Sequence, residues 1–176
     1  MRVAVPVTLI CLAGITCPAP AALAALNAGQ PAPLTAPITV QTLEGRDVLL
    51  AEQVRGATML VFWAGWCGPC IREIAELNEL HAWYGPKGLK VIGLGVREGD
   101  ETLEKIRQAA AKHKIAYPVL FDAQGTATKA FELAGVPASF LIDVAGMITW
   151  QGAMLPADIN DRIKRALSPG GERGQK

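Results

Sequence analysis

The sequence predicts an α/β protein with a central mixed β-sheet and helices on both of its faces. From Thr58 onward, short runs of β-branched and aromatic residues alternate with longer runs of helical periodicity. Such alternation implies parallel strands joined by right-handed crossovers. The last three predicted elements are strand, strand and helix, which adds an antiparallel neighbour to the parallel core. Apolar residues make up 51% of the 176 residues, enough for one folded domain with an ordinary core.

Residues 1–25 have the organisation of a secretory signal. Arg2 is the only charged residue before Glu44, an apolar run follows at Val3–Ile15, and small residues dominate Pro18–Ala25. A basic start, an apolar segment of about 7–15 residues and a small-residue cleavage site define such signals, whereas a membrane span needs roughly 20 apolar residues. We therefore expect cleavage near residues 21–25 and export to the periplasm or another extracytoplasmic space. An uncleaved N-terminal anchor and lipidation at Cys17 are the alternatives.

The rest of the chain divides into a linker, one domain and a tail. Residues 26–37 carry three prolines and predict a linker, residues 38–167 form the domain, and residues 168–176 read as a loose, charged tail. The domain opens with a hairpin around Glu44-Gly45. Further strands are predicted at residues 58–64, 89–96, 119–121, 138–143 and 147–151, and helices at residues 68–84, 100–114, 126–134 and 156–167.

The helix at residues 68–84 is predicted by apolar residues at three- and four-residue steps, which are Ile71, Ile74, Leu77, Leu80 and Tyr84. Glu73, Glu76 and Glu79 lie off this apolar stripe. Overall charge is balanced, with 17 basic and 16 acidic residues. We therefore expect no nucleic-acid partner, which would require a basic patch to neutralise phosphates.

The cysteine pattern indicates redox chemistry. Two of the four cysteines, Cys11 and Cys17, would leave with the signal, so that the mature chain keeps only Cys67 and Cys70 in a C-x-x-C pattern. The pattern lies where a predicted strand ends and a helix begins. Unpaired N–H groups and the helix dipole should stabilise a thiolate at Cys67 and lower its pKa.

The other residues of the motif suit this role. Cys70 lies one turn further on, where its thiol can attack a mixed disulfide formed at Cys67. Gly68 leaves the approach to Cys67 open, and Pro69 suits the first turn of a helix. A purely structural disulfide is one alternative. Half of a zinc site is another, but its further ligands could only be His81 and His113, whose spacing fits no usual pattern, so we expect no metal and no cofactor.

Two segments resemble the thioredoxin superfamily. Residues 61–70, VFWAGWCGPC, are similar to its active-site segment, and residues 135–143, GVPASFLID, to a second signature in which the proline is cis. The leading signal, the hairpin and the extra strand and helix at residues 118–134 resemble the TlpA/ResA/CcmG-like group. The resemblance implies the thioredoxin fold with an N-terminal hairpin and an inserted strand–helix unit.

The same resemblance implies roles for individual residues. Cys67 is expected to be the nucleophile and Cys70 the resolving cysteine. Pro137 matches the cis-proline, which would present the backbone of Val136 to an extended substrate segment. Trp66 is expected to shield the disulfide and to offer partners a flat apolar surface, whereas Trp63 belongs to the core.

The chain departs from the family pattern at two positions, Val61 and Ala75, and matches it at Glu73. Thioredoxin has a buried acid six positions before its first cysteine, where this chain has Val61. Glu73 matches a glutamate that the ResA-like branch places near its disulfide, and it is either a general base for Cys70 or an acid that suits the first turn of the helix. A proline that often follows that glutamate is Ala75 here.

The predicted activity is thiol-disulfide exchange, with protein disulfides as substrates. Gly-Pro dipeptides in the motif are typical of reducing thioredoxins, near about −270 mV, rather than of DsbA, near about −120 mV. We expect a monomeric reductant that a membrane donor supplies with electrons, acting on apocytochrome c or copper-site cysteines. A disulfide oxidase or isomerase and a non-enzymatic thiol metal carrier are the alternatives. A thiol peroxidase is disfavoured because no P-x-x-x-T/S-x-x-C pattern precedes Cys67.

Overall fold

A computed structural model describes residues 26–168 of the chain. The predicted signal, together with Cys11 and Cys17, lies outside the described residues. No helix within residues 26–168 is long and apolar enough to span a bilayer. The strands are β1 (Thr39–Thr42), β2 (Asp47–Leu49), β3 (Thr58–Trp63), β4 (Lys90–Val96), β5 (Val119–Asp122), β6 (Ala138–Ile142) and β7 (Ile148–Gly152). The helices are α1 (Leu50–Gln53), α2 (Gly68–Tyr84), α3 (Leu103–Lys112), α4 (Thr126–Ala130) and α5 (Ile159–Ala166), with a 3-10 turn η1 at Gly85–Lys87.

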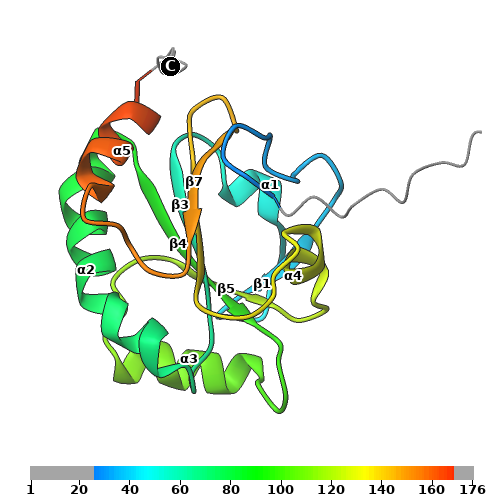
Figure 1. Ribbon diagram of the computed structural model, residues 1–176. Coiled ribbons are helices and arrows are strands. Elements are labelled where there is room, and N and C mark those ends of the chain that lie inside the picture. The colour runs from blue at the N-terminus through cyan, green and yellow to red at the C-terminus, as the bar shows by residue number, and fades with distance from the viewer. Residues whose placement is uncertain (1–25, 169–176) are drawn as a thin grey trace, which may run out of the picture.

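The strands form one seven-stranded mixed sheet in the order β2-β1-β5-β4-β3-β6-β7. Parallel pairs join β3 to β4 and β4 to β5, whereas β1, β2, β6 and β7 pair in antiparallel fashion. Helices α2 and α5 cover one face, and α1 and α4 lie on the other (Figure 1). The predicted mixed sheet with helices on both faces is therefore confirmed, including the hairpin at its start and the β5–α4 insertion.

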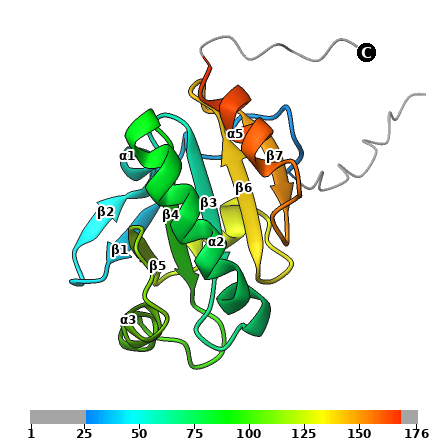
Figure 2. The same cartoon turned by 90° about the vertical axis from the view of Figure 1, so that its left-hand side faces the viewer.

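Strand β3 lies inside the sheet and is buried along its whole length, with alternate residues facing opposite layers. On one face, the Phe62 ring packs at an angle against the rings of Phe131 and Phe140, at centroid distances of 5.2 and 5.8 Å. On the other face, Val61 shares a cluster with Leu77 of α2. In Figure 2, α2 crosses in front of this second face. This packing fixes the direction in which α2 leaves the end of β3.

Four helices differ from the sequence prediction, among them α5, which begins at Ile159 rather than at residue 156. Helix α3 starts at Leu103 rather than at residue 100, because Thr102 caps it by accepting the Lys105 N–H at 3.3 Å. Helix α4 ends at Ala130, and Glu132 adopts a left-handed φ of 51°. The short helix α1 has no counterpart in the prediction. The shift at α3 matters for the site, since it leaves Asp100 and Glu101 in the loop before the helix.

The segment treated as a linker packs on the domain. The Gly29 N–H donates to the Ile148 carbonyl at 2.7 Å, and the Ile148 N–H donates to the Gln30 carbonyl at 2.8 Å. Pro31 forms a β-bridge with Met147, and Ala32 is buried. Ordered structure therefore begins upstream of residue 38.

Candidate active site

The two cysteines of the described chain form a disulfide directly after β3. Cys67 and Cys70 are joined at an S–S distance of 2.02 Å, with their Cα atoms 5.3 Å apart. Strand β3 ends at Trp63, and α2 begins at Gly68, so Cys67 is the residue that caps the helix. The disulfide thus lies at the carboxyl end of a central strand, a place where α/β proteins commonly carry their sites.

The environment of the Cys67 sulfur favours negative charge. Cys67 has extended backbone angles, and its Sγ accepts the Cys70 N–H at 3.2 Å. Pro69 lies in the first turn, where a missing N–H removes no helical bond. A sulfur that caps a helix receives both an unpaired N–H and the positive end of the helix dipole. In the dithiol form, these groups would stabilise a thiolate at Cys67.

The surface around the disulfide is unevenly exposed. Cys67 and Cys70 are only 3% and 4% exposed, whereas Trp66 is 55% exposed. Trp63 is buried in the core. Gly68 is exposed, and a Cβ there would meet only Arg72 Nη1, at 3.8 Å. The indole of Trp66 is therefore a large exposed apolar group in the segment that carries the disulfide.

The Val136–Pro137 peptide bond is cis, as the sequence resemblance predicts. Strand β6 follows immediately, and Ala138 pairs with Phe62 near the carboxyl end of β3. This pairing brings Val136 to the end of the sheet at which Cys67 lies. Among residues 26–168, none forms a hydrogen bond with the Val136 backbone. Its N–H and C=O are thus free to pair with another chain.

Glu73 is buried rather than displayed on the outside of α2. It is 3% exposed, although the sequence places it off the apolar stripe. Its Oε1 accepts the Leu155 N–H from the segment between β7 and α5, and its Oε2 is buried without a partner. Burial raises the pKa of the Glu73 carboxyl, the Leu155 hydrogen bond opposes this, and the charge of Glu76 adds to it.

Further polar groups lie beneath α2, and the sequence did not point to them. Burial raises the pKa of Tyr117, and the charge of Glu73 raises it further. The side chains of Trp63 and Tyr117 both pass over Gly93, within 3.2 Å of where its Cβ would be. Ser139 is fully buried opposite Val61, and its Oγ has no partner. Only the pairing of β3, β4, β5 and β6 brings these residues together, so no local sequence signal could have found them.

The two histidines do not complete a metal site. The His81 ring lies 6.4 Å from that of Tyr117, and His113 lines a cavity beside Trp66. Within the described part of the chain, no group of three or more His, Cys, Asp or Glu residues is arranged to hold a metal ion.

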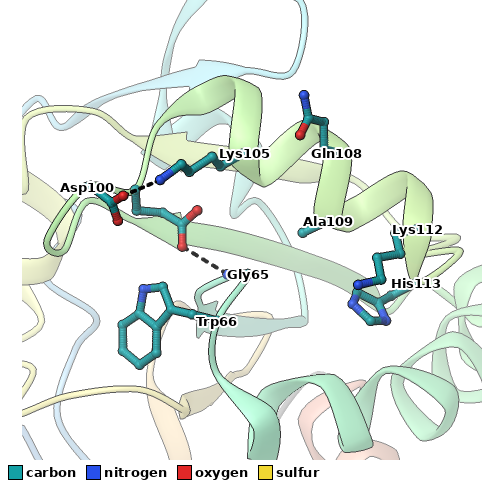
Figure 3. A pocket seen from close by; sticks show the side chains of 9 residues that line it. Gly65, Trp66, Asp100, Lys105, Gln108, Ala109, Lys112 and His113 are labelled. Carbon is teal, nitrogen blue, oxygen red and sulfur yellow. Dashed lines mark hydrogen bonds and ion pairs between the residues drawn. The ribbon is translucent and has the colours of Figure 1, made fainter.

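The cavity beside Trp66 measures about 340 Å³ and lies between the active-site segment and α3. Figure 3 shows Trp66 on one side of it and Lys105, Gln108 and Lys112 of α3 on the other. At its base, the Gly65 N–H donates to Glu101 Oε2 at 3.1 Å. The sequence singled out neither Gly65 nor Glu101.

Known proteins resemble this chain in sequence and in fold. The AhpC/TSA family model matches residues 28–151. The thiol-disulfide oxidoreductase ResA of Geobacillus thermodenitrificans (strain NG80-2) is 31% identical over 133 residues, 74% of this chain and 75% of the relative. Sporulation thiol-disulfide oxidoreductase A of Bacillus subtilis (strain 168) is 25% identical over 119 residues, 68% of this chain and 71% of the relative.

A solved structure shows the same architecture. The thiol:disulfide interchange protein DsbE from Chlorobium tepidum superposes with a TM-score of 0.69 at 28% identity, covering 81% of this chain and 99% of that one. The expected thioredoxin-like fold and oxidoreductase activity are confirmed by these relatives. The chain belongs to the AhpC/TSA family, as a thiol-disulfide oxidoreductase of the TlpA/ResA/CcmG-like group.

Proposed function

We propose that this protein is an exported dithiol reductant of partner-protein disulfides, with Cys67 as nucleophile and Cys70 as resolving cysteine. The observation that carries the assignment is the position of the Cys67 sulfur, which caps α2 and accepts the Cys70 N–H at 3.2 Å. Cys70 lies inside the first turn, and no residue within 26–168 donates a hydrogen bond to its sulfur. The two thiols of the reduced protein therefore differ in acidity, with Cys67 the more acidic.

The first step joins the protein to its substrate. The Cys67 thiolate attacks one sulfur of a partner disulfide, the partner's S–S bond breaks, and the released partner sulfur takes up a proton. A mixed disulfide now links Cys67 to the partner. The free N–H and C=O of Val136 pair with the extended backbone beside the attacked cysteine, in the manner of an added strand.

The second step releases the product. The Cys70 thiol gives its proton to Glu73, and the resulting thiolate attacks the Cys67 sulfur, breaking the mixed disulfide. The second partner sulfur leaves and is protonated. Two electrons have then passed from the dithiol to the partner, and the protein is left with the Cys67–Cys70 disulfide. A membrane electron donor must restore the dithiol before another cycle.

Glu73 suits the role of proton acceptor. It lies three residues after Cys70 on α2, a spacing at which helical side chains are neighbours. One of its oxygens is bound to Leu155 and the other has no partner, so the second oxygen is available to a proton. Its raised pKa also brings the carboxyl closer to that of a thiol, which makes proton transfer between them easier.

Partner capture tests the assignment of the two cysteines. In the native host, Cys70→Ser should accumulate a mixed disulfide at Cys67, because the resolving thiol is gone, whereas Cys67→Ser should capture nothing. Mass spectrometry of the adduct would identify the partner, with the haem-attachment cysteines of apocytochrome c and copper-site cysteines as the expected classes. Equal capture by both variants would refute the assignment of the nucleophile.

The direction of electron flow has a separate test. Equilibration of the protein with glutathione and dithiothreitol buffers measures its reduction potential, and a reductant should lie near the thioredoxin value of about −270 mV. A value above about −150 mV would instead support the oxidase or isomerase reading. Export is tested by fusing residues 1–25 to a reporter that is active only outside the cytoplasm.

A further inference from the structure

We propose that Glu101 is a positioning residue for thiol-disulfide exchange, because it fixes the backbone segment that carries Trp66 and Cys67. This role rests on the proposed function of Cys67 as the nucleophile. Glu101 belongs to the loop between β4 and α3, 36 positions from the glycine that it contacts. It therefore ties the disulfide segment to a separate part of the fold.

The burial of Glu101 is unusual for a charged side chain. The residue is 4% exposed, and no cation within residues 26–168 forms an ion pair with it. The neighbouring Asp100 is exposed and pairs with Lys105. Buried carboxyl groups are rare unless a specific contact compensates for their lost hydration. For Glu101, the contact that the structure provides is the Gly65 N–H.

Gly65 is closely enclosed at this point. A Cβ at Gly65 would lie 3.1 Å from the Ala109 Cβ on α3 and 3.5 Å from Glu101 Oε1. Such a contact is tighter than ordinary van der Waals packing, so any other side chain would push the segment away from α3. The hydrogen bond to Glu101 and this close approach hold the segment in one place.

The segment that Glu101 fixes at Gly65 continues directly to Cys67. Cys67 follows Gly65 by two residues, and its N–H donates to the Ala64 carbonyl at 3.1 Å, which forms a tight turn. Trp66, between them, is more than half exposed and has no side-chain hydrogen bond within the described chain. Attack on a disulfide requires the thiolate to approach along the S–S axis, and small misplacements of a reacting group slow such reactions strongly.

Three single variants test the proposal in the full-length reduced protein. Glu101→Ala removes the acceptor, Glu101→Gln keeps an acceptor oxygen of the same reach, and Asp100→Asn is the matched control, an exposed acid next to it in the chain. Two rates are measured for each, the reduction of the aromatic disulfide 5,5′-dithiobis(2-nitrobenzoate) and the alkylation of Cys67 by iodoacetamide. Thermal unfolding of each oxidised variant is recorded alongside.

We expect Glu101→Ala to lower both rates about tenfold, Glu101→Gln to stay within threefold of wild type, and Asp100→Asn to be unchanged. Wild-type rates for Glu101→Ala, or equal losses in the alanine and glutamine variants, would overturn the proposal. Failure of the wild-type protein itself to exchange disulfides would instead refute the proposed function.

A second set of variants tests the proposal even if the Glu101→Ala protein does not fold. Gly65→Ala should slow the same two reactions by pushing the segment off α3, and adding Ala109→Gly, which removes the facing methyl group, should restore most of the rate. The Ala109→Gly single variant gives the reference for any helix destabilisation. If Gly65→Ala reacts at the wild-type rate, the position of this segment does not control Cys67 and the proposal is wrong.

Discussion

Glu73 and Glu101 are two buried acids that flank the disulfide segment, one following Cys70 and the other contacting the residue two positions before Cys67. Both are less than 5% exposed, at 3% and 4%, and each accepts a backbone N–H from a distant part of the chain. The two acids differ in the surroundings of their carboxylate oxygens. Glu73 has a buried oxygen without a partner and a raised pKa, whereas Glu101 lies at the edge of a solvent-accessible cavity against a glycine.

Because of this difference, Glu73 suits a role in proton transfer and Glu101 suits a role in positioning the backbone. A carboxyl group that is to accept a proton needs a free oxygen and a pKa close to that of the donor. A carboxyl group that fixes a backbone segment needs only an acceptor oxygen and close packing. Glutamine can replace the second kind of group but not the first. Matched Glu→Gln substitutions therefore distinguish the two roles.

The largest expected effect is on the resolving step. Glu73→Gln should slow release of the mixed disulfide about 100-fold near neutral pH, since general bases commonly contribute a factor of about 10²–10⁴. Initial attack by Cys67 should change far less. Stopped-flow measurement of both phases with a peptide disulfide separates them, and Glu79→Gln, an exposed acid on the same helix, is the control. Equal slowing of both phases would remove Glu73 from the proton-transfer role.

The next effect is on stability against pH. Because burial raises the pKa of Glu73 in the folded protein above its unfolded value, the folded state binds the proton more tightly. The contribution of Glu73 to the free energy of unfolding is therefore greatest below the unfolded pKa of about 4.3. It falls as the pH rises from there through the pKa of the folded protein. Each unit by which the folded pKa exceeds the unfolded pKa corresponds to about 1.4 kcal/mol of unfolding free energy.

Glu73→Gln should remove this decline in the oxidised protein, which keeps the cysteines out of the titration. Urea unfolding from pH 4 to pH 8 should therefore show the variant gaining stability relative to wild type as pH rises. A constant difference across this range would mean that the carboxyl does not titrate differently in the two states.

The smallest expected effect comes from Glu76. Its charge is the weakest of the causes that raise the pKa of Glu73, so Glu76→Gln should lower that pKa slightly. The pH profile of the resolving step should move slightly to lower pH, with its maximum rate unchanged. A loss of maximum rate as large as that expected for Glu73→Gln would instead mean that Glu76 takes part in proton transfer.

Sequence patterns predicted most of the fold because its elements are locally encoded. The apolar run of β3, the helical stripe of α2 and the hairpin turn each depend on neighbouring residues, and each lies where it was expected. Helix α3 was predicted to begin at residue 100, but Thr102 caps it, so Asp100 and Glu101 lie before its first residue, Leu103.

The site was predictable only in part, for a different physical reason. Cys67, Cys70 and Pro137 lie in short motifs that can be recognised along the chain. The burial of Glu73 depends on a segment 82 positions away, and the contact of Glu101 depends on how α3 packs against Gly65. Long-range packing of this kind leaves no periodic trace in the sequence.

Residues 29–31, which precede β1, affect where a foreign strand can pair with the sheet. Edge strands are natural templates for adding a foreign strand, and residues 29–31 pair with Met147 and Ile148 at the start of the edge strand β7. A foreign strand therefore cannot pair with the start of β7, which lies at the end of the sheet away from Cys67.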